Sequence, residues 1–144
     1  MDRRPYFIDA SVPMYAAGAD HPLKRPCVAV LSAVARGDVV AVTDAEVHQE
    51  ILHRYSALGD RRRAIEVSGL FLRAVPEVLA VTRADVEAAG GLLGAHARLR
   101  VRDAIHLAVM ARHSLPRIVT ADGHFDDLPG IVRVDPGDWE RGAR

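Results

Sequence analysis

Short apolar runs alternate along the chain with longer segments in which apolar residues recur at helical spacing. The short runs, rich in β-branched residues, predict strands at residues 6–8, 39–42, 78–81, 117–120 and 131–134. Strands that alternate with helices pair in parallel and are covered on both faces. The pattern therefore predicts an α/β fold, a three-layer α/β/α sandwich with a mostly parallel central sheet.

Two segments with capping-box spacing indicate where helices begin. Thr43 and Glu46 have this spacing, and Thr82 and Asp85 have it again. We therefore expect helices to start near residues 43 and 82. In the first of them Glu46 is expected to complete the cap, while Glu50, one turn later, lies at the border of the core-facing side.

The length and composition of the chain are typical of a single domain. We therefore expect residues 1–144 to form one domain. The chain is 49% hydrophobic, and 19 basic residues balance 19 acidic ones. A lone cysteine, Cys27, cannot build a disulfide framework, so we expect a buried thiol and a reducing compartment. Since no apolar run approaches the ~18 residues of a membrane span, we expect a cytoplasmic protein without a membrane partner.

Acidic residues directly follow two of the predicted strands. Asp9 ends the run Tyr6-Phe7-Ile8, and Asp122 follows the strand that contains Ile118. Ligands of open parallel sheets bind beyond the carboxyl ends of the strands. Either aspartate alone is an ordinary loop residue, but together they predict a shared site.

Helices and a turn add three more candidate carboxylates. Glu50 borders an apolar helix face, and Asp103 begins an inward stripe that continues to Leu107. Asp103 is equally explained as an N-cap or a helix-dipole partner. Asp126, four residues after Asp122, is either a further site residue or a simple turn residue.

Carboxylates that converge in a half-buried cleft repel one another unless a cation compensates their charge. No Cys or His at ligand spacing accompanies these acids, so the oxygen ligands favour Mg²⁺ or Mn²⁺. Such an ion can orient a water, lower its pKa and neutralise charge on a phosphodiester. The residues leave open whether one ion or two are bound.

Four short motifs occur at residues 7–11 (FIDAS), 43–52 (TDAEVHQEIL), 102–106 (RDAIH) and 122–126 (DGHFD). In order and spacing they resemble the PIN-domain family, in particular the VapC-like toxins of bacterial toxin–antitoxin pairs. The resemblance covers nearly the whole chain. In one departure, Arg100 stands three residues before the helix aspartate, where relatives commonly have a capping Ser or Thr.

The resemblance assigns roles to particular residues. It implies a catalytic and metal-binding set of acids, an additional candidate ligand at Asp126, and Ser11 as the group that positions a metal-bound water. The implied set of acids is Asp9, Glu50, Asp103 and Asp122.

The activity implied by the resemblance is endonucleolytic cleavage of RNA by metal-activated water. It also implies a small antitoxin that inserts a segment into the cleft, and usually a homodimer. Clustered arginines are either guides for RNA phosphates or ordinary solvated helix faces. They are Arg54, Arg61, Arg62, Arg63, Arg98, Arg100 and Arg102.

Two alternatives from other classes stay open at this point. One is a binding module of the same fold whose acids do not catalyse, and the other is a metal-dependent phosphatase. A nuclease needs an open cleft and a small-molecule phosphatase a closed pocket. Neither that distinction nor the RNA target can be deduced from the residues.

Overall fold

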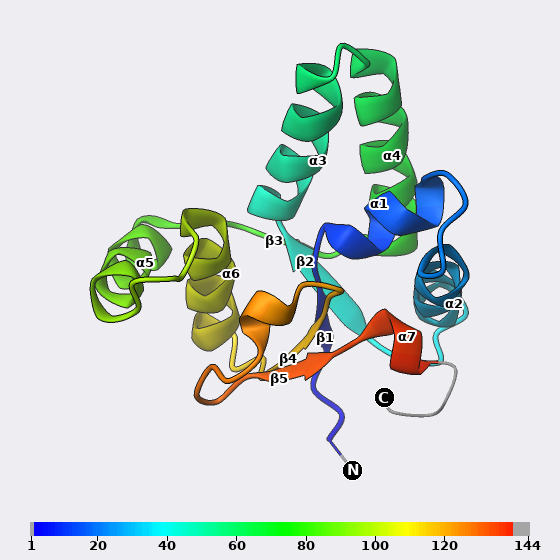
Figure 1. The fold of residues 1–144 in the computed structure, drawn as a ribbon. Coiled ribbons are helices and arrows are strands. Elements are labelled where there is room, and N and C mark those ends of the chain that lie inside the picture. Colours follow the sequence, from blue (N-terminus) through cyan, green and yellow to red (C-terminus); the bar gives the residue numbers. More distant parts are fainter. Residues whose placement is uncertain (1, 140–144) are drawn as a thin grey trace.

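The computed structural model describes residues 2–139 and contains one five-stranded sheet in the order β3-β2-β1-β4-β5 (Figure 1). Every neighbouring pair of strands is parallel. The strands are β1 (Tyr6–Ile8), β2 (Ala41–Asp44), β3 (Val78–Leu79), β4 (Arg117–Val119) and β5 (Val132–Val134). The predicted α/β class and parallel sheet are thereby confirmed.

Helices cover both faces of the sheet, which gives the predicted three layers. In Figure 1, α5 and α6 lie on one side and α1, α2 and α7 on the other, while α3 and α4 form a hairpin that extends past the carboxyl end of the sheet. Their bounds are α1 (Ser11–Ala17), α2 (Lys24–Ala35), α3 (Ala45–Ala57), α4 (Arg61–Ala74), α5 (Arg83–Ala95), α6 (Val101–Arg112) and α7 (Pro136–Trp139), with a 3₁₀ turn η1 (Gly123–Phe125).

The core is centred on β1 and β4, whose apolar side chains are buried because helices pack on both faces. Phe7, Ile8, Ile118 and Val119 are all fully buried. Cys27 is buried as expected, and burial raises the pKa of its thiol to about 12. Along residues 2–139 no helix is long and apolar enough to cross a membrane.

Strand β2 and the start of α3 differ from the sequence-based prediction. The strand covers Ala41–Asp44 rather than residues 39–42, and Val40 is exposed. Thr43 is not the cap of α3: its hydroxyl donates to the Ile8 carbonyl at 2.9 Å inside the sheet. Asp44 caps the helix instead by accepting from the Val47 amide. Thr and Asp are both good N-caps, and the register of β2 against β1 decided between them.

The second predicted capping box is confirmed. Thr82 caps α5, its hydroxyl accepts from the Asp85 amide, and the Asp85 carboxylate accepts from the Thr82 amide. This carboxylate also accepts from Arg112, and that bond lowers the Asp85 pKa to about 2. The capping box thereby ties α5 to α6, the helix that carries Asp103.

Candidate functional site

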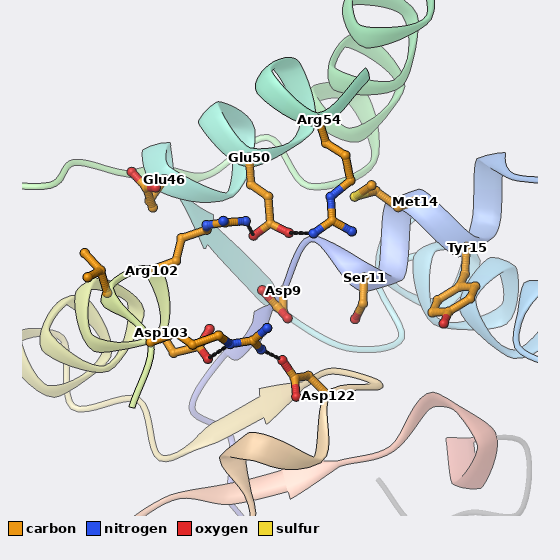
Figure 2. Close-up of a pocket in the computed structure, with 12 residues that line it drawn as sticks. Asp9, Ser11, Met14, Tyr15, Glu46, Glu50, Arg54, Arg102, Asp103 and Asp122 are labelled. Atoms are coloured by element: carbon orange, nitrogen blue, oxygen red, sulfur yellow. Dashed lines mark hydrogen bonds and ion pairs between the residues drawn. The ribbon is translucent and has the colours of Figure 1, made fainter. Parts of the chain in front are cut away.

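A cleft of about 670 Å³ opens at the carboxyl ends of the central strands, and Figure 2 shows the side chains that line it. Its lining is mostly charged. The four predicted acids and Ser11 are brought together there: Asp9, Ser11, Glu50, Asp103 and Asp122.

Asp9 directly follows β1 and is buried. The Thr120 hydroxyl, at the end of β4, donates to Asp9 Oδ2 at 2.7 Å. Burial raises the pKa of Asp9, and the opposing influence of His106 and of the Thr120 hydrogen bond favours the charged form. A cation bound next to Asp9 would therefore offset the energetic cost of burying its charge.

Thr120 and Ser11 link the ends of β1 and β4. The Thr120 hydroxyl accepts from the Asp122 amide at 3.0 Å and lies 3.3 Å from Ser11 Oγ, which in turn accepts from the Ala121 amide at 3.1 Å. Thr120 was missed by the sequence analysis. A polar residue between a buried strand and Asp122 was the available signal.

Glu50 projects into the cleft from α3, one turn after Glu46. It lies between two arginines, 3.0 Å from Arg102 Nη1 and 3.6 Å from Arg54 Nη2 (Figure 2). Glu46 also lines the cleft, and burial raises its pKa. Its expected role in a capping box is wrong, since Asp44 is the N-cap of α3.

Asp103 and Asp122 share one arginine. Arg100 Nε donates to Asp103 Oδ2 at 3.1 Å, and its Nη2 pairs with Asp122 Oδ2. Arg100 is the N-cap residue of α6 but makes no side-chain capping bond. The departure noted in the sequence therefore replaces a neutral cap with a cation that neutralises two site acids.

His106 is a second group that the sequence analysis did not place at the site. It lies on α6 one turn after Asp103 and is fully buried. Its Nδ1 is 2.8 Å from Asp44 Oδ2, and its Nε2 is 3.7 Å from Asp9 Oδ1. Burial alone would lower the pKa of this imidazole, but the hydrogen bond to Asp44 and the nearby carboxylate charges raise it.

The other candidate residues divide between the cleft and the surface away from it. Asp126 is exposed and pairs with Arg133 at 2.7 Å, an ion pair that lowers the Asp126 pKa. Arg54, Arg100 and Arg102 line the cleft. The arginines that start α4 do not: Arg61, Arg62 and Arg63. The α4 group lies at the far end of the α3–α4 hairpin in Figure 1.

Comparison with known proteins gives four further findings. A model of the PIN domain matches residues 6–131. Ribonuclease VapC13 of Mycobacterium tuberculosis is 44% identical over 128 residues, which are 88% of this chain and 97% of that protein. The crystal structure of M. tuberculosis VapC20, described as a sarcin–ricin loop cleaving toxin, has a TM-score of 0.74 at 22% identity and covers 90% of this chain and 98% of its own. A toxin–antitoxin complex from Klebsiella pneumoniae has a TM-score of 0.63 at 17% identity, over 88% and 95% of the two chains.

Proposed function

This chain belongs to the PIN-domain family, and on that premise we propose that it is a metal-dependent endoribonuclease, the toxin component of a toxin–antitoxin pair. We take residues 1–144 as one domain and the cytoplasm as its compartment. The observation that carries the proposal is the convergence of acids from separate elements in one cleft: Asp9, Glu50, Asp103 and Asp122. A ribonuclease that is 44% identical to this chain over most of its length supports RNA cleavage as the reaction.

The side chains present fit a hard divalent cation, Mg²⁺ or Mn²⁺. Carboxylate oxygens dominate the cleft, and Asp9 is buried with its charge only partly compensated. We propose Asp9, Glu50, Asp103 and Asp122 as ligands. A bound ion would activate a water and neutralise charge on the scissile phosphodiester.

Residues beside the four acids orient the site or can contact the substrate. Thr120 fixes the rotamer of Asp9 by its hydrogen bond, and Ser11 anchors the turn that carries Asp122. From this place Ser11 can also orient a water beside Asp9. Arg54 and Arg102 lie at the cleft with partly exposed side chains, where guanidinium groups can contact RNA phosphates.

We propose that a small antitoxin controls this site, since a structural relative is a toxin–antitoxin complex. Arg100 shows that a guanidinium can pair with Asp103 and Asp122 together. A partner could present a second arginine to the same carboxylates and exclude the metal. From its family we also expect the protein to form a homodimer. A measurement of its molecular mass in solution tests this expectation.

Cleavage of labelled RNA tests the proposed reaction. The parent protein should cleave RNA with Mn²⁺ and lose activity in EDTA, and Glu50→Gln should lower the rate about a hundredfold. Glu87→Gln, the same change at an exposed residue of α5, is the matched control and should keep full activity. Hydrolysis of a phosphate monoester without RNA cleavage would indicate a phosphatase instead.

Growth of cells after induction tests the toxin role. Expression of the parent should arrest growth with RNA cleavage, Glu50→Gln should remove the arrest, and a small protein encoded beside the gene should restore growth by direct binding. Arrest that persists with Glu50→Gln would favour a binding module whose acids do not catalyse.

A further inference from the structure

His106 is a buried ionisable group that the proposed reaction does not use. It lies on the inward face of α6, has no exposed surface, and its ring packs against Phe7 at 5.3 Å between centroids. An imidazole at this place could be an ordinary core residue. Its two nitrogens, however, have very different surroundings.

The Nδ1 side is fixed by Asp44. This carboxylate is fully buried, caps α3 through the Val47 amide, and places Oδ2 2.8 Å from His106 Nδ1. An ionised carboxylate only accepts hydrogen bonds, so Nδ1 carries a proton and donates it. The neutral ring then has its lone pair on Nε2.

The Nε2 side faces the site acids. Nε2 has no hydrogen-bond partner among residues 2–139 and lies 3.7 Å from Asp9 Oδ1, which is too far for a hydrogen bond. Asp9, Glu50 and His106 each offer one ligand atom, and these atoms lie within 4.8 Å of one another. Ligands that share an ion at about 2.1–2.3 Å lie roughly 3–4.5 Å apart, so only small shifts are needed.

We propose that His106 Nε2 is a direct ligand of the ion bound by Asp9 and Glu50, with Asp44 as the positioning residue that orients the ring. This inference rests on the metal dependence in the proposed function. A metal-bound histidine commonly donates its second N–H to a carboxylate, which is the arrangement of His106 and Asp44. One nitrogen among oxygens favours Mn²⁺ over Mg²⁺, because Mn²⁺ is a first-row transition metal and accepts a nitrogen ligand more readily than Mg²⁺ does.

Charge balance is consistent with this role. Three carboxylates lie near the imidazole: Asp44 at Nδ1, Asp9 on the Nε2 side, and Asp103 one turn earlier on α6. They stabilise a positive charge beside Nε2, and a divalent ion would occupy that position. Asp9, Glu50 and the Nε2 lone pair of His106 would together hold the ion.

Metal binding to the full chain tests the assignment without reference to activity. Pulsed EPR of the parent with Mn²⁺ should show hyperfine coupling to an imidazole ¹⁴N, and His106→Gln should remove it. Calorimetry should show Mn²⁺ affinity lower by about tenfold in His106→Gln, with Mg²⁺ affinity changed less. His113→Gln, at the exposed end of the same helix, is the matched control and should keep the coupling.

The outcomes separate this inference from the proposed function. Tight Mn²⁺ binding by the parent without ¹⁴N coupling would overturn the histidine ligand and leave the nuclease proposal standing. RNA cleavage in EDTA, with no Mn²⁺ bound, would overturn the metal dependence itself. Because the decisive spectrum comes from the parent, a misfolded His106→Gln variant would not prevent the test.

Discussion

The two sides of the acidic cleft neutralise their carboxylates in different ways. On the histidine side, Asp9 is held by Thr120 and faces His106, all of them buried. On the arginine side, Asp103 and Asp122 share Arg100, whose side chain is 54% exposed. A buried network has one low-energy arrangement, whereas a long exposed side chain can leave at little cost.

This difference indicates how the site can accept ligands. The histidine side is preorganised, with its groups tied to strand ends and to the cap of α3. The arginine side is occupied by a cation from the chain itself, which must move if metal or an RNA phosphate is to reach Asp103 and Asp122. We therefore expect substitutions on the histidine side to affect catalysis more strongly.

The same substitution on each side should give the largest contrast. Asp9→Asn should lower the rate of RNA cleavage about a hundredfold, because it removes charge at a buried ligand. Asp122→Asn should lower the same rate only about tenfold, since Asp122 is more exposed than Asp9 and is paired with Arg100. Single-turnover cleavage measures both. Equal losses would show that the two sides do not differ in function.

Thr120 joins the two sides, and its hydroxyl can be removed with little change of shape. Thr120→Val leaves Asp9 Oδ2 without its donor and the Asp122 amide without its acceptor. We expect unfolding free energy to fall by about 1–3 kcal/mol in urea denaturation. Thr120→Ser keeps the hydroxyl and should recover most of this loss. A Val variant as stable as the Ser variant would contradict the linking role.

Metal binding should stabilise the folded protein through the histidine side. Mn²⁺ at ten times its dissociation constant should add about 1.4 kcal/mol. For a chain of 144 residues this raises the melting temperature by about 3–5 °C. Asp9→Asn should remove most of the shift, and Asp126→Asn, outside the cleft, should keep it. Superimposed melting curves of the parent in EDTA and in Mn²⁺ would exclude the metal site.

The arginine side should give the smallest effect and the opposite sign. Arg100→Ser removes the competing cation and provides a capping hydroxyl for α6, so Mn²⁺ affinity should rise by about fivefold. Arg98→Ser, outside the cleft lining, serves as the control in the same calorimetric titration. Weaker Mn²⁺ binding by Arg100→Ser would mean that Arg100 holds the acids in place for the ion.

Local sequence determined the framework of the site. The apolar runs of β1 and β4 predicted central strands, and parallel pairing then placed Asp9 and Asp122 at one edge. The capping box of Thr82 and Asp85 was readable because its hydrogen bonds span only three residues. These features depend on the backbone conformation of a few consecutive residues. The types of those same residues control it.

Tertiary structure alone decided the contacts between distant segments. His106 and Asp44 lie 62 positions apart, and in the sequence His106 is only a polar residue on an apolar helix face. Arg100 is 22 positions from Asp122, and Thr120 is 111 from Asp9. Asp44 rather than Thr43 caps α3, because the Thr43 hydroxyl forms a hydrogen bond with the neighbouring strand. These partners are set by how strands and helices pack, and no periodicity along the chain encodes which side chains then meet.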